Sequence, residues 1–178
     1  MVDELPKNFR ECVTVTQQLG IRYLWIDSLC IIQPVPGDSK DWEAESATMG
    51  DVYQHSTINI AATAAEHCDG GLFRDRDPAG IGATIELAGS WCRGVKGGTY
   101  ALSNLWKDEL ESSPLLQRGW VFQERILAKR MLHFGQSQII WECGELRASE
   151  TLPKGRIDNA RDVDENSKTM LTKLKHYK

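Results

Sequence analysis

The chain has 178 residues, of which 41% are apolar and 26% charged, and its formal net charge at pH 7 is −4. This length and composition are typical of one soluble globular domain with a real core, and they exclude a fibrous or disordered chain. The negative charge argues against a nucleic-acid interface, and no apolar run approaches the ~20 residues that span a bilayer.

The cysteines and the N-terminus indicate a reducing compartment. The five cysteines are scattered, without a C-x-x-C pair or a zinc-type spacing. The first residues lack the basic and apolar segments of a secretory signal. We therefore expect a cytoplasmic protein with no metal site, no resident cofactor, and no membrane or nucleic-acid partner.

The first third of the chain predicts alternating helices and strands. Apolar residues recur at helical spacing over residues 6–19, and a short apolar run at 22–27 predicts a buried strand. A second helix is predicted at 39–54 and a second strand at 57–62. This order favours an α/β fold built on a parallel sheet.

Beyond residue 65 the pattern changes to a long polar loop around Leu72 and Phe73, followed by short elements. We expect strands at 84–87 and 99–102 joined through Gly97 and Gly98, a short helix at 120–127, a hairpin of 131–134 with 138–141, and a charged final stretch from 153, either helical from Asn166 or a flexible end.

Asp27 and its neighbour Ser28 stand at the end of the first predicted strand. Ligands in open α/β sheets gather beyond the carboxyl ends of the strands, so both side chains are candidates to line a site. A carboxylate that merely caps a loop is an equally good interpretation.

Several blocks, taken together, resemble the fungal heterokaryon-incompatibility (HET) domain. The hallmark block is residues 19–33 (LGIRYLWIDSLCIIQ), and residues 118–125 (RGWVFQER) form another. Between and after them lie the shorter blocks 41–45 (DWEAE), 70–73 (GGLF) and 141–143 (WEC). The resemblance covers roughly residues 5–143.

The resemblance implies a HET domain over residues 1–150 and a charged segment over 151–178. Because HET domains are remote relatives of TIR domains, it also implies a TIR-like, flavodoxin-like parallel-sheet core, with hairpins and short helices added in the C-terminal half. Family members usually carry an upstream strand with a Ser-Tyr-x-Trp-Gly motif, which does not precede residue 1 here. We therefore expect a fragment or a shortened gene product.

The same resemblance implies a role in fungal non-self recognition that ends in programmed cell death. Self-association, or another incompatibility protein, is the implied partner. Some TIR relatives cleave NAD as a substrate, using a glutamate that follows a tryptophan near a helix start. Here Glu45 follows Trp42, so Glu45 and Asp27 are the candidate catalytic residues. A helix glutamate paired with an arginine is the alternative for Glu45.

The remaining candidates are aromatic and basic residues. Trp25, Trp42 and Trp120 are candidates to stack on a substrate ring, or else anchors of the core. Arg118 is a candidate to bind a phosphate or to pair with a carboxylate, whereas Arg125 is expected to form a structural ion pair.

Two residues beside these candidates are interpreted structurally. Cys30 is expected to be a small buried residue rather than a nucleophile. Gly119 is expected to permit a tight approach or a positive φ before the helix.

Two functional hypotheses remain open. In one, the protein is an NAD-cleaving enzyme. In the other, it is a non-catalytic signalling module that acts by self-association and by recruiting partners.

Overall fold

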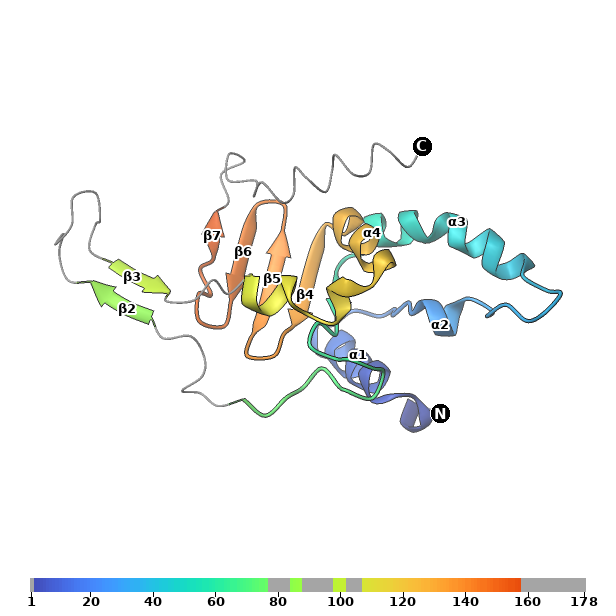
Figure 1. Ribbon diagram of the computed structural model, residues 1–178, viewed down its shortest axis with the longest axis horizontal. Coiled ribbons are helices and arrows are strands. Elements are labelled where there is room, and N and C mark those ends of the chain that lie inside the picture. Colours follow the sequence, from blue (N-terminus) through green and yellow to red (C-terminus); the bar gives the residue numbers. More distant parts are fainter. Residues whose placement is uncertain (1, 77–83, 88–97, 102–106, 158–178) are drawn as a thin grey trace.

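This computed structural model combines helices with a mixed β-sheet (Figure 1). The structure describes residues 2–76, 84–87, 98–101 and 107–157. The helices are η1 (Val2–Glu4), α1 (Lys7–Gln18), α2 (Asp27–Cys30), α3 (Lys40–His55), η2 (Lys107–Glu111), η3 (Leu115–Gln117) and α4 (Gly119–Leu127). The strands are β1 (Asn59–Ala61), β2 (Thr84–Leu87), β3 (Gly98–Ala101), β4 (Arg130–Phe134), β5 (Ile139–Cys143), β6 (Leu146–Ser149) and β7 (Arg156–Ile157).

The main sheet has the order β1-β4-β5-β6-β7, and β2 pairs with β3 in a separate antiparallel ribbon. Among the strands that the structure describes, only β1 and β4 run parallel, with Ile60 opposite Leu132. The neighbours β4 and β5 form the antiparallel hairpin that the sequence predicts, with His133 opposite Ile140. The fold is therefore mixed α/β. One parallel pair confirms α/β character without confirming a TIR-like parallel core.

The predicted strand at residues 22–27 is wrong. Residues 21–26 form no ladder within the described chain and lead directly into α2. Strand propensity is satisfied only when a neighbouring strand takes up the backbone hydrogen bonds, and none lies beside this segment. The helices predicted at 6–19, 39–54 and 120–127 are confirmed as α1, α3 and α4.

Some sequence predictions lie outside the described residues. These are the turn residue Gly97, the helix from Asn166 and the bulk of the charged C-terminal segment. The strands predicted on either side of that turn are confirmed as β2 and β3.

The core lies between α1 and the sheet. Val15 of α1, Leu72 of the polar loop and Phe134 of β4 form its buried centre. Leu72 is fully buried, whereas the neighbouring Phe73 is 43% exposed and meets the Phe134 ring edge-on at 6.0 Å. Helices α2 and α3 bury no residue and lie to one side of the sheet, with the end of α3 beside α4 (Figure 1).

The polar loop is fastened to α1 through its backbone. The Glu11 carboxylate accepts from the N–H groups of both Leu72 and Phe73, and Asn8 Oδ1 accepts from Gly71 N–H at 2.6 Å. In return, Cys68 offers its carbonyl to the Asn8 N–H at 2.9 Å. These bonds explain the Gly-Gly-Leu-Phe sequence, because they hold the loop where Leu72 enters the core.

Helix α4 is held on the sheet by an ion network around Glu142 of β5. Arg125 of α4 donates two hydrogen bonds of 2.8 Å to the Glu142 carboxylate, which confirms the expected structural pairing of Arg125. His133 Nε2 lies 3.3 Å from the same carboxylate, and His133 Nδ1 lies 3.1 Å from the Thr63 hydroxyl. Since His133 and Thr63 are almost completely buried, the network links α4 to the interior of the sheet.

These contacts hold the pKa of Glu142 well below its ordinary value. Burial alone would raise it, but hydrogen bonds to His133 and Arg125 and their positive charge outweigh that effect. A lowered pKa means that the carboxylate stabilises the fold above its unfolded-state pKa, near 4.5, and that this contribution disappears as the pH falls toward the lowered value.

We predict that Glu142→Gln lowers the free energy of unfolding at pH 7 by about 2–4 kcal/mol, because it leaves Arg125 and His133 without their charged partner. The difference between wild type and variant should narrow below about pH 4. Urea unfolding at pH 7 and pH 3 measures both effects. Glu145→Gln, at an exposed position in the following turn, is the matched control. Equal stability of the two variants at pH 7 would contradict the network.

Gly71→Ala is predicted to destabilise the loop by about 1–2 kcal/mol, because Gly71 has φ +81 and a left-handed backbone is costly for other residues. Its added Cβ would also lie 2.7 Å from Lys7 Cε. Gly119→Ala is the control. Gly119 has no positive φ, and no atom lies within 4 Å of a Cβ built at this position. The expectation of a tight approach or a positive φ at Gly119 is therefore wrong. Thermal unfolding should separate the two variants, and equal melting temperatures would refute the prediction.

Candidate functional site

The blocks at residues 19–33 and 118–125 meet beside the C-terminal end of α3. Tyr53, near the end of that helix, lies close to Glu124 of α4, and the two side chains perturb each other's pKa. The Tyr53 ring also meets the Trp25 ring edge-on, with centroids 6.0 Å apart and planes at 82°. Asp27, two residues after Trp25, lies close enough to both Tyr53 and Glu124 to perturb their protonation. We call Trp25, Asp27, Tyr53 and Glu124 the acidic cluster.

The electrostatics of the acidic cluster favour a protonatable carboxyl at Glu124. Burial raises the pKa of Glu124, and the negative charge of Asp27 raises it further. The hydrogen bond from Tyr53 and the positive charge of Arg118 lower it, but the net shift is upward. Burial also raises the pKa of Tyr53, and so do the negative charges of Glu124 and Asp27, so the phenol stays protonated. A carboxyl of this kind, next to an ionised one, is a common arrangement in catalytic sites.

Glu124 lies in the cluster while its neighbour Arg125 is directed elsewhere, toward the sheet. Successive residues of a helix point about 100° apart, so Arg125 turns toward Glu142 while Glu124 faces α2 and α3. The sequence analysis assigned no site role to Glu124 or to Tyr53. The signal that it missed is a carboxylate and an arginine side by side within one block.

Glu45 lies on the stretch of α3 that faces the Asp27 segment. Asp41, one turn earlier, accepts a 2.8 Å hydrogen bond from the Ile32 N–H, and Tyr53 contacts Trp25, so both ends of this stretch turn toward residues 25–32. Around the helix axis, Glu45 is about 40° from Asp41 and Tyr53 is about 120° from it, so Glu45 falls between them. Its side chain is exposed and has no hydrogen-bond or ion-pair partner in the described part of the chain.

The other predicted site residues are exposed. Trp42 is 40% exposed and Trp120 71% exposed, so these tryptophans are not core anchors. Arg118 is exposed at the start of α4, within electrostatic reach of Glu124. Ser28 is exposed on α2, where its N–H donates to Asp27 Oδ1 at 2.7 Å. These side chains are accessible to a ligand.

The expectation that Cys30 is buried is wrong. Cys30 ends α2 and is exposed, because the segment before it is not enclosed in a sheet. Among residues 21–55, only Ile31 is buried.

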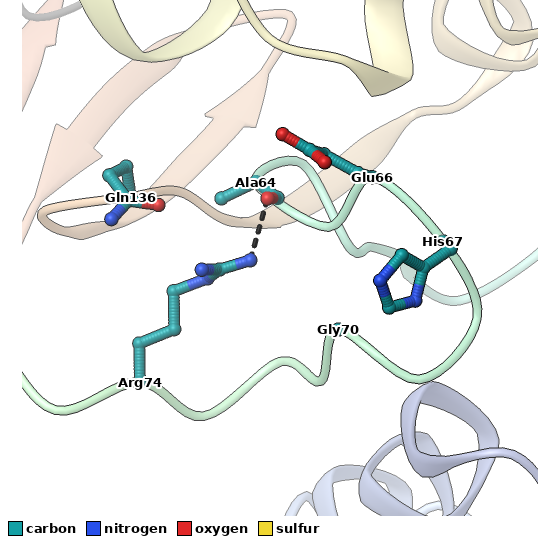
Figure 2. Close-up of a pocket in the computed structure, with 6 residues that line it drawn as sticks. All are labelled: Ala64, Glu66, His67, Gly70, Arg74 and Gln136. Atoms are coloured by element: carbon teal, nitrogen blue, oxygen red, sulfur yellow. Dashed lines mark hydrogen bonds between the residues drawn. The ribbon is translucent and has the colours of Figure 1, made fainter.

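A small polar cavity of about 230 Å³ lies away from the acidic cluster, beside the loop that α1 fastens. Figure 2 shows Arg74 reaching across this cavity to the Ala64 carbonyl, to which its Nη2 donates at 2.6 Å. The cavity is lined by Ala64, Glu66, His67, Gly70, Arg74 and Gln136. None of these is a predicted site residue, and the guanidinium is already bonded to the protein backbone. We therefore place the candidate chemistry at the acidic cluster.

The described residues contain no group of histidine, cysteine and acidic side chains that fits a metal ion. None of their helices combines the length and the apolar character that a membrane crossing requires.

Comparison with known families gives a match to the family described as Heterokaryon incompatibility protein (HET). The match covers residues 1–124, which include all four residues of the acidic cluster. Neither the curated proteins nor the solved structures gave a match.

The contacts of the acidic cluster predict that two substitutions shift the pKa of Glu124 in opposite directions. Asp27→Asn should lower the pKa of Glu124, because it removes a neighbouring negative charge, and Tyr53→Phe should raise it, because it removes a hydrogen bond to the ionised form. A carbon-detected NMR titration of the Glu124 carboxyl group measures both. Asp51→Asn, at an exposed position of α3, is the control and should leave this pKa unchanged. Shifts of the same sign in the first two variants would contradict the assigned contacts.

Proposed function

Because this chain belongs to the heterokaryon incompatibility (HET) family, we propose that it promotes programmed cell death after fungal non-self recognition by cleaving NAD. Family membership itself points to a role in heterokaryon incompatibility. The cleavage proposal is supported by one observation above all. Asp27 and Glu124, from two separate sequence blocks, interact electrostatically, and the basic side chain of Arg118 lies within reach of Glu124.

The reaction suits a group of carboxylates. Hydrolysis breaks the bond between ribose C1′ and the nicotinamide nitrogen, whose electron pair leaves with neutral nicotinamide. Positive charge then develops on the ribose, and an anionic side chain placed against it stabilises that state. A water molecule forms the new C1′–O bond and gives up one proton, which requires a base. Leaving-group protonation is unnecessary, so the site needs an anion and a base rather than a strong acid.

We assign these roles to three acidic residues. Glu45 and Asp27 are the anions proposed to face the ribose and its developing charge. Glu124, whose pKa burial and the charge of Asp27 raise, is proposed to accept the proton from water. Trp25, Trp42 and Trp120 are proposed to stack on the nicotinamide or adenine ring, Ser28 to line the site, and Arg118 to bind the diphosphate.

A second candidate function is a non-catalytic module that acts by self-association and recruitment of partners. The observation that favours it is the exposure of large apolar side chains around α2. Tyr23 is 80% exposed, Ile32 73%, Val35 62% and Leu29 51%. Surfaces of this kind commonly bind other proteins.

NAD consumption by the purified protein distinguishes these functions. Wild type should release nicotinamide and ADP-ribose, and Glu45→Gln or Glu124→Gln should reduce the rate at least about 100-fold through loss of an essential carboxylate. Glu43→Gln is the matched control. Glu43 lies on the same helix and faces roughly away from Glu45. Its carboxylate accepts a hydrogen bond of 2.5 Å from the Ser39 hydroxyl.

Two outcomes would count against cleavage. If wild type and both variants release nicotinamide at the same background rate, the acidic cluster is not an active site. If expression of the protein causes cell death while the NAD level stays constant, the non-catalytic module is favoured instead.

A further inference from the structure

Arg74 places an uncompensated positive charge beside the small polar cavity of Figure 2. Its Nη2 donates to the Ala64 carbonyl, but its Nε is buried without a hydrogen-bond partner. No carboxylate in the described part of the chain forms an ion pair with this guanidinium. A buried donor without an acceptor is costly, and an anion in the cavity would supply the missing counter-charge.

The His67 ring lies on the other side of the cavity from the Arg74 guanidinium, as Figure 2 shows. His67 Nδ1 accepts from the Asp69 N–H at 3.3 Å, which leaves the Nε2–H of the ring as a donor. The Gln136 side chain also lines the cavity, and its amide forms no hydrogen bond with the residues that the structure describes. The cavity is thus lined by three kinds of N–H donor.

Hydrogen bonds to α1 fix both sides of this cavity in advance. The His67 carbonyl accepts from Asn8 Nδ2 at 3.3 Å. On the other side, the Glu11 carboxylate accepts at 2.9 Å from the N–H of Phe73, the residue before Arg74. A site whose sides are already held loses little conformational freedom when a ligand binds.

We propose that this cavity binds a small oxyanion, a phosphate or carboxylate group, between Arg74 and His67. A guanidinium matches the geometry of both groups. The volume of about 230 Å³ is below the ~300–1,000 Å³ of pockets that enclose drug-sized ligands, so the ligand is a small molecule rather than a dinucleotide. The site shares no residue with the acidic cluster, and the proposal does not rest on NAD cleavage.

Glu66 is the one lining residue whose charge opposes an anion. Its side chain is exposed, so solvent and salt screen its charge, whereas the Arg74 Nε is buried. The guanidinium therefore dominates, and the opposing carboxylate makes binding weak, in the millimolar range. This residue also gives the site a test with a distinctive sign.

Binding would act on the polar loop as a whole. His67 and Arg74 lie before and after Leu72, the loop residue that enters the core. An anion that joins them would link both limbs of the loop and stabilise the folded chain by mass action.

Titration of the 178-residue chain with inorganic phosphate or malonate at constant ionic strength tests the site. The NMR signals of the Arg74 Nε–H and the His67 ring should shift saturably. Arg74→Gln, followed at His67, should weaken binding at least about tenfold, and Glu66→Gln should strengthen it about two- to fivefold. Arg130→Gln is the matched control, because Arg130 also donates to a backbone carbonyl, that of Thr57 at 3.4 Å, but does not line the cavity.

Saturable binding of either anion supports the proposal, and the tighter of the two identifies the ligand class. The proposal is overturned if sodium chloride reproduces the shifts at equal ionic strength, or if Glu66→Gln binds no more tightly than wild type. Since Glu66 is exposed, its substitution leaves the fold intact and keeps the test decisive should Arg74→Gln fail to fold. None of these measurements involves NAD, so the anion site and the enzymatic proposal succeed or fail separately.

Discussion

The ion network around Glu142 is the constraint on which the rest of the structure depends. Arg125 and His133 converge on this carboxylate from α4 and β4, and Thr63 extends the network to the loop after β1. The network has to form as a unit, because each buried member would be costly without its partners. The network also affects the direction of a neighbouring side chain in the site. With Arg125 fixed toward the sheet, the adjacent Glu124 faces α2 and α3, where Asp27 and Tyr53 meet it.

The hydrogen bonds between α1 and the polar loop have a different role. Glu11 and Asn8 bind backbone N–H groups of residues 71–73, so Leu72 becomes a core residue although it belongs to an irregular loop. The same loop lines the small cavity of Figure 2, which makes that cavity a product of the fastening. The Gly-Gly-Leu-Phe block is thus explained by structure.

Residues 21–55 contrast with the core that these fastenings create. Apart from the buried Ile31, this region contacts the body chiefly through Tyr53 and the end of α3, which meet α4, and it leaves several large apolar side chains exposed. Apolar surface left open in one place is usually completed by binding. The exposed apolar side chains that favour an interaction module therefore lie in the same region as Asp27, which is proposed to face a substrate.

The sequence by itself determined the elements whose signals are local. Periodicity and end signals predicted α1, α3 and α4, turn residues predicted the β4–β5 hairpin, and the sequence blocks identified the family. Only the tertiary structure decided the rest. Residues 22–26 have strand composition but no neighbouring strand, and pairing depends on what lies beside a segment rather than on what it contains. Likewise, Glu124 became a site residue because Arg125 is bound elsewhere and Asp27 lies nearby. Arg125 and Glu142 are 17 positions apart in the sequence, and Asp27 and Glu124 are 97 apart. Contacts between residues this far apart leave no local pattern in the sequence.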